Sequence, residues 1–160
     1  LNSAGLARFP EQALEYARVG IGMFGVQAGL APALTFATAI SQIREVPAGE
    51  GIGYGTTDAA GHDRRIAVLP VGYADGYPRH LSNGKGRVAV RGQLVPVVGR
   101  VCMDMTLIDV TDVEGVGAGD AVVLFGLQPT LEEVARWADT IAYELIARIP
   151  ARVARIHRGG

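Results

Sequence analysis

The sequence has few of the residues that build disulfide frameworks, metal clusters and redox sites. Its 160 residues include a single cysteine, Cys102, a single lysine, Lys85, and three well-separated histidines. One cysteine excludes an internal disulfide and a cysteine metal cluster, and the scattered histidines predict no metal site. The lone thiol fits a reducing compartment, so we expect a cytoplasmic protein.

Concentrated charge and long apolar runs are also missing. The formal net charge is −1 and the arginines are scattered, which predicts no nucleic-acid partner. No apolar run approaches the roughly 20 residues of a membrane-spanning helix, so we expect no membrane association. Apolar residues nevertheless make up 49% of the chain, which is enough to bury a core at this length.

The start of the chain predicts an incomplete α/β unit. Residues 9–17 predict a short helix with Pro10 in its first turn, and residues 19–24 predict a buried strand. A helix that feeds one strand cannot close a sheet by itself. Because the first residue is Leu1 rather than methionine, we expect the chain to be part of a longer protein, with a domain boundary within 27–32.

The remainder of the chain predicts a mainly β domain. Turn signals separate apolar runs that are rich in β-branched residues, as expected for a small β-barrel or sandwich. Thr130 and Glu133 form a capping box at the start of one helix that Pro150 ends. Val153 and Ile156 alternate with arginines and indicate a final strand. The other expected strands cover residues 34–46, 66–71, 87–91, 93–98, 101–110 and 120–125.

Tyr54 stands out because it lies between two glycines, Gly53 and Gly55. Small neighbours leave the phenol ring uncovered and let a ligand or another chain approach the backbone. Tyr54 is therefore a candidate acid or base, although a free phenol with a pKa near 10 needs nearby positive charge or hydrogen bonds to act as a base. The alternative is a glycine-rich turn in which the tyrosine ring has only a packing role.

Further motifs accompany Tyr54 in a fixed order, and several ordered motifs are a far more specific signal than any one of them. They are Asn2-Ser3-Ala4, Arg18 to Gly25, Gly72 to Tyr77, Gly99 to Asp104, Thr140 to Glu144 and Arg152 to Arg155. Together they resemble the C-terminal portion of the pyridoxal-phosphate-dependent alanine racemases over practically the whole chain.

The resemblance implies a fold, an activity and a partner. Residues 1–30 would be the end of a TIM-type β/α barrel domain, and residues 31–160 a β-rich alanine racemase C-terminal domain. The implied isomerase interconverts L-alanine and D-alanine with pyridoxal 5'-phosphate and supplies D-alanine for cell-wall peptidoglycan. It is implied to be a homodimer in which the tyrosine of one subunit enters the site of the other.

The resemblance also implies roles for individual residues at the cofactor. Arg18 matches the arginine that faces the pyridine nitrogen, where a guanidinium can only donate a hydrogen bond. Four further groups match those that hold the cofactor phosphate: the amides of Gly20 and Ile21 and the hydroxyls of Ser3 and Tyr143. Amides and hydroxyls are suitable hydrogen-bond donors to a phosphate.

At the substrate, the resemblance makes Tyr54 the base on one face, while a lysine that carries the cofactor serves the other. The backbone amide of Met103 matches the group that meets the substrate carboxylate, and Tyr73 matches an aromatic residue that hydrogen-bonds near Tyr54. Arg79, Arg100 and Ile141 fall at the substrate entryway. On its own, Met103 would equally be part of one face of a strand.

Two departures from the family pattern leave alternatives open. The family usually has an aromatic residue where Asp58 stands, and Lys85, in a turn, matches no cofactor lysine. The chain alone is therefore expected to be inactive, and the cofactor lysine is expected in the barrel domain that it mostly lacks. The alternatives are a racemase for serine or a broader range of amino acids, and a non-catalytic β-barrel binding module.

Overall fold

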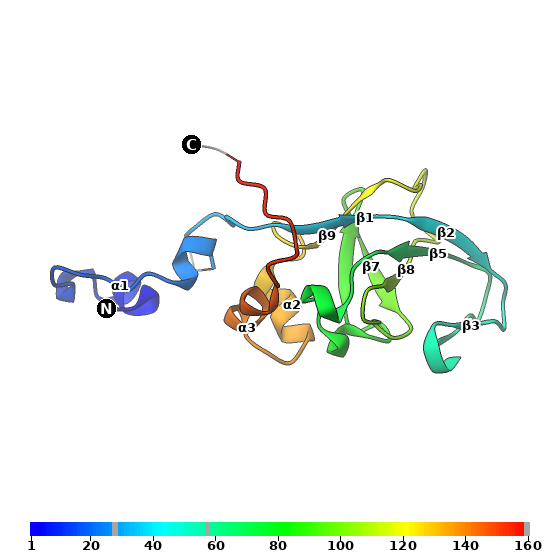
Figure 1. Ribbon diagram of the computed structural model, residues 1–160, viewed down its shortest axis with the longest axis horizontal. Coiled ribbons are helices and arrows are strands. Elements are labelled where there is room, and N and C mark those ends of the chain that lie inside the picture. The colour runs from blue at the N-terminus through cyan, green and yellow to red at the C-terminus, as the bar shows by residue number, and fades with distance from the viewer. Residues whose placement is uncertain (27–28, 57, 159–160) are drawn as a thin grey trace.

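The computed structural model describes residues 1–26, 29–56 and 58–158. An N-terminal segment projects away from a compact β domain along the longest axis of the molecule (Figure 1). The segment contains one helix, α1 (Ser3–Arg8), and the 3-10 turns η1 (Pro10–Gln12) and η2 (Ile21–Phe24). Among the described residues, no helix is long and apolar enough to cross a membrane.

Both elements expected in the N-terminal segment were wrongly placed. The helix predicted over 9–17 lies earlier, because the Asn2 side chain accepts a hydrogen bond from Gly5 N at 2.8 Å and starts α1 there. Pro10 begins only the short turn η1. The strand predicted over 19–24 is wrong, because residues 21–24 form η2, which ends at Gly25 with a left-handed φ of 75°.

The β domain is built on seven antiparallel strands, in agreement with the predicted mainly β fold. Their order across the sheet is β1-β9-β6-β7-β8-β5-β2. Only Ile40 and Ser41 separate β1 from β2, although these strands are the two ends of that order. The strands are β1 (Phe36–Ala39), β2 (Gln42–Val46), β5 (Arg64–Leu69), β6 (Arg87–Val90), β7 (Gln93–Val98), β8 (Thr106–Asp109) and β9 (Ala121–Phe125).

The short link between β1 and β2 explains why the sheet curls into a barrel. Ile40 N donates to Asp120 O on one side, and Ser41 N donates to Val68 O on the other, both at 2.9 Å. One continuous segment, 36–46, therefore pairs with both ends of the sheet (Figure 1). A separate two-stranded hairpin of β3 (Gly51–Ile52) and β4 (Asp58–Ala59) extends from β2 and β5 and was not expected from the sequence.

The C-terminal part contains two short helices rather than the single helix that was predicted. Thr130 starts α2 (Leu131–Trp137) with the expected capping box, in which Thr130 N donates to Glu133 Oε2 at 2.8 Å. The chain then turns at Asp139, which has a left-handed φ of 55°, before α3 (Ala142–Arg148). The final strand expected at 153–156 is absent, because Arg155 donates to Ile149 O and Val153 O and holds this segment in an irregular fold.

Two apolar clusters stabilise the β domain. The larger one fills the barrel and the space under α2 and α3, and Ile21 of the N-terminal segment joins it. The smaller one lies beneath the β3–β4 hairpin and consists of Ile52, Ala60, Ile66 and Val98, with Val46 and Leu107 packed against it.

Tyr77 is an unusual member of the larger cluster. It is fully buried, and its hydroxyl makes no hydrogen bond with any residue that the structure describes. Burial raises the pKa of this phenol, because the phenolate would lose its hydration. The unfolded chain releases this proton once the pH passes about 10, whereas the folded chain keeps it, so ionisation favours unfolding at alkaline pH.

We therefore expect Tyr77→Phe to leave the free energy of unfolding at pH 7 unchanged or higher. An unpaired buried hydroxyl costs about 1–3 kcal/mol, which its removal recovers. The advantage over the unsubstituted chain should grow above pH 10. Urea unfolding at both pH values measures this, with the exposed Tyr16→Phe as the control. A clear loss of stability at pH 7 would show that the hydroxyl has a partner in solution.

Candidate functional site

Tyr54 lies at the tip of the β3–β4 hairpin, in the turn η3 (Tyr54–Thr56), at one end of the molecule (Figure 1). Its side chain is 70% exposed. Gly53 and Gly55 adopt left-handed φ angles of 72° and 74°, which side chains rarely tolerate. The tip rests on the backbone of the loop after β7, where a Cβ at Gly99 would lie 2.9 Å from Ile52 O. The sequence thus presents an uncovered phenol on a supported turn.

Tyr73 and Met103 come from different parts of the chain and lie together. Tyr73 begins the turn η4 (Tyr73–Asp75), and its N–H donates to Cys102 O at 3.0 Å. Ala74 N donates to Met103 O at 2.9 Å. No described residue accepts a hydrogen bond from Met103 N–H, so this amide is available to a ligand.

A cleft of about 370 Å³ opens beside the Tyr54 tip, and its lining is cationic. The Arg100 guanidinium lies about 3.5 Å from where a Cβ on Gly55 would be, so it flanks the tip. Lys85 is one of the residues that line this cleft. The full lining is Arg79, His80, Ser82, Asn83, Lys85 and Arg100.

Cys102 is not an activated nucleophile in this surrounding. Its pKa is raised, first by burial and then by the charge of Asp104, while Arg79 acts weakly in the opposite direction. The thiol donates to Arg100 O, with 3.3 Å between sulfur and oxygen. The thiol therefore stays protonated at neutral pH.

The N-terminal segment forms a second group of candidate residues. The buried Ser3 Oγ accepts hydrogen bonds from Gly20 N at 3.0 Å and from Gly22 N at 3.4 Å. A Cβ on Gly20 would meet no atom within 4 Å, so the space beside this glycine is open. No described residue accepts from Ile21 N–H. The Ser3 hydroxyl and the Ile21 N–H, beside an open space, are groups that fit a phosphate.

Arg18 belongs to this N-terminal group. Its backbone N–H donates to Leu1 O at 2.7 Å, and it forms an isolated β-bridge with Asn2, which fixes it beside α1. Tyr143 is an exposed residue of α3, on the side of the β domain that faces this segment (Figure 1).

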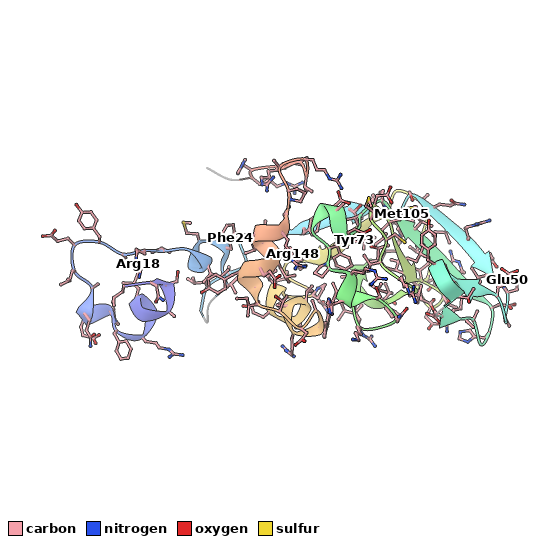
Figure 2. All side chains as sticks on the ribbon, turned by 60° about the horizontal axis from the view of Figure 1, so that its bottom comes forward. Arg18, Phe24, Glu50, Tyr73, Met105 and Arg148 are labelled. Atoms are coloured by element: carbon pink, nitrogen blue, oxygen red, sulfur yellow. The ribbon has the colours of Figure 1, made fainter. Side chains whose placement is uncertain are left out.

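The two groups of candidate residues do not meet within one chain. Figure 2 shows Arg18 at one end of the molecule and Glu50, the residue before the Tyr54 hairpin, at the other, with Tyr73 and Met105 between them. The structure therefore brings Ser3, Gly20 and Ile21 together at one end, and places Tyr54 far from them.

One feature at the hairpin was missed in the sequence. Asp58 was noted only as a departure from the family pattern, whereas Arg64 and Asp109 were not singled out. The Arg64 guanidinium lies between the two carboxylates, with Nη1 3.3 Å from Asp58 Oδ1 and Nε 3.6 Å from Asp109 Oδ2. The opposite charges of Arg64 and the two aspartates are compatible with ion pairs, but only the register of the strands shows that these residues are neighbours.

The chain was compared with known proteins. The profile of the family "Alanine racemase, C-terminal domain" matches residues 33–157. The alanine racemase of Halothermothrix orenii is 46% identical, over 98% of this chain and 44% of its own length. That of Alteromonas mediterranea is 42% identical, over 97% of this chain and 45% of its own. The chain thus spans less than half the length of these curated relatives.

Solved structures give the same result. The alanine racemase of Streptomyces lavendulae superposes with a TM-score of 0.91 at 36% identity, covering 99% of this chain and 45% of that one. The alanine racemase of Bartonella henselae, solved with covalently bound pyridoxal phosphate, has a TM-score of 0.90 at 31% identity, over 97% of this chain and 45% of that one. The chain therefore belongs to the alanine racemase family, whose C-terminal domain it contains.

Proposed function

We propose that this chain is the C-terminal part of a cytoplasmic, pyridoxal-phosphate-dependent enzyme that interconverts L-alanine and D-alanine, and so provides D-alanine for cell-wall peptidoglycan. The observation that carries the proposal is that the similarity to alanine racemases covers both ends of the molecule, the N-terminal segment and the Tyr54 hairpin, in 98% of the chain. A binding module that kept only the barrel scaffold would have no need for the cofactor-type residues of the N-terminal segment together with the Tyr54 hairpin.

The residues of the N-terminal segment fit the cofactor. Ser3 Oγ, the amides of Gly20 and Ile21, and the Tyr143 hydroxyl would hold the phosphate, while the Arg18 guanidinium would donate to the pyridine nitrogen. When bound, pyridoxal phosphate supplies an electron sink for the charge left when the α-proton of the amino acid departs. A guanidinium has hydrogen-bond donors and no acceptor, so Arg18 in this position would limit how far that nitrogen gains a proton.

The residues near the hairpin fit the substrate. Tyr54 would hold or accept the proton at the α-carbon on one face, and Tyr73 would support its hydroxyl by a hydrogen bond. The free amide of Met103 would donate to the substrate carboxylate. The Arg100 guanidinium flanks the same turn and lies about 3.5 Å from where a Cβ on Gly55 would be.

The separation of the two ends supports a homodimer with shared sites. Because Arg18 and Tyr54 lie at opposite ends of the chain, one subunit alone cannot place both at one substrate. In a symmetric dimer, the hairpin of each subunit would complete the site of the other. The 160-residue chain alone should be inactive.

Mixing two inactive variants of the longer protein tests this proposal. One variant carries Tyr54→Phe and the other Arg18→Ala. After subunit exchange, half of the dimers are mixed, and each mixed dimer has one site with both residues intact. We expect an equimolar mixture to recover about a quarter of the unsubstituted activity, as statistical exchange in a twofold dimer requires.

The controls for this experiment are each variant mixed with itself, which should stay inactive. No recovery in a mixture that has demonstrably exchanged subunits would place both residues in one subunit's site. No racemisation of any amino acid by the unsubstituted longer protein would instead favour the binding module.

A further inference from the structure

The ion pairs at the base of the Tyr54 hairpin form a continuous chain of contacts. Asp58 is the first residue of β4, and Arg64 is the first residue of β5. Arg64 contacts Asp58 through Nη1 and Asp109 of β8 through Nε. Asp109 Oδ1 in turn accepts from Thr111 N at 3.0 Å and from Thr111 Oγ1 at 2.5 Å. The hairpin is thereby connected to the barrel through one guanidinium.

Apart from the ion pairs, the described residues of the hairpin make short backbone pairing, a small apolar cluster and the close approach of Ile52 to Gly99. β3 and β4 pair through two residues each, and Ala60 N donates to Glu50 O at their base. Beneath them lies the small apolar cluster, to which the described residues of the hairpin contribute Ile52 and Ala60. Few buried contacts and short pairing predict that this segment opens locally more easily than the barrel.

The side chains of the ion-pair chain are sheltered from water. Arg64, Asp58 and Asp109 have exposed side-chain fractions of 18%, 22% and 17%. By contrast, Arg91 pairs with Asp120 at a similar distance of 3.2 Å but is 50% exposed. Arg64 Nε is buried and makes no hydrogen bond with a described residue, so the two carboxylates are the groups that compensate the guanidinium charge. Removing one partner of a sheltered pair costs more than removing one partner of a surface pair.

We propose that Arg64, clamped between Asp58 and Asp109, is a positioning residue for Tyr54: the ion-pair chain fixes the hairpin on the barrel and so fixes the direction in which the phenol points. The consequence for catalysis rests on the proposed function, whereas the consequence for the hairpin does not.

The test compares matched substitutions in the longer protein. Arg64→Gln and Asp58→Asn each break the chain without changing side-chain size greatly. Arg91→Gln makes the same substitution in the exposed pair and is the control. We expect amide hydrogen exchange in residues 51–56 to become about tenfold faster in the first two variants. Exchange in β7 should stay the same in all three, and Arg64→Lys should largely restore protection.

Activity is measured in the same variants. A misdirected Tyr54 should lower kcat about tenfold or more and leave KM for alanine nearly unchanged, because the carboxylate contact at Met103 is intact. Unchanged exchange in residues 51–56 of both Arg64→Gln and Asp58→Asn would overturn the inference. Faster exchange with normal kcat would uphold the clamp and count against Tyr54 as the proposed base.

Discussion

Tyr54→Phe in the longer protein should reduce racemisation at least about 10²-fold in both directions, since acid–base groups typically contribute 10²–10⁴-fold. The substitution keeps the ring and removes only the hydroxyl. Because Tyr54 is 70% exposed and its hydroxyl makes no hydrogen bond with a described residue, folding and cofactor binding should survive. Steady-state rates from each enantiomer, with the visible spectrum of the bound cofactor, measure both effects.

Isotope exchange separates the two faces of the substrate. In Tyr54→Phe, exchange of the α-proton with solvent deuterium should persist for the enantiomer whose proton points away from Tyr54. Tyr73→Phe is the control, because a supporting hydroxyl should matter less than the base itself. Normal racemisation by Tyr54→Phe, or a larger loss in Tyr73→Phe, would show that the catalytic assignment is wrong.

Gly72→Ala should strongly destabilise the β domain beside Tyr73 and Met103. A Cβ at this position would lie 2.3 Å from Cys102 O and 2.5 Å from Met103 C, both of them backbone atoms that cannot rotate away. The same backbone accepts hydrogen bonds from Tyr73 and Ala74, so any shift breaks them. Overpacking of this kind typically costs 1–3 kcal/mol, and we expect about 3 kcal/mol or more here.

Urea unfolding measures the effect of Gly72→Ala, and Gly117→Ala is its matched control. A Cβ on Gly117 would meet no atom within 4 Å, so the same methyl group should change the free energy of unfolding little. Equal losses in the two variants would mean that the backbone around Cys102 yields more easily than the structure indicates.

Much of the barrel could be predicted from the sequence because its strands carry a local signal. Residues 87–90, 93–98 and 121–125 are dense in β-branched residues, and the turns between them contain glycine. The strand predicted over 101–110 is shorter in the structure, since the carbonyls of Cys102 and Met103 accept hydrogen bonds from the η4 turn instead of from a strand. The break between the two helices at Asp139 was not predicted, because the spacing of apolar residues does not reveal a residue with a left-handed backbone conformation.

The N-terminal segment was misjudged for a different reason. The pattern of residues 19–24 fits a buried strand, yet no strand among the described residues pairs with this segment, and its interleaved glycines allow a 3-10 turn. Where a segment has no strand to pair with, the local conformational preferences of its residues determine its backbone conformation.

The candidate site was only partly predictable. Glycine neighbours alone indicated that Tyr54 would be uncovered. The clamp of Arg64 could not be found, because it depends on the pairing of Ile66 with Asp109 and on where the hairpin folds back. The distance between Arg18 and Tyr54 was equally hidden, since sequence order carries no information on which end of a molecule a motif occupies.

The closure of the barrel by segment 36–46 has a consequence during synthesis on the ribosome. β2 finds its partner β5 within about two dozen residues, whereas β1 waits for β9, whose pairing joins Phe36 to Phe125. Pairing across such a separation is slow. Until β9 has left the ribosome, β1 and the strand edge of β6 are unpaired and apolar, and this is the interval in which a nascent chain needs protection from its neighbours.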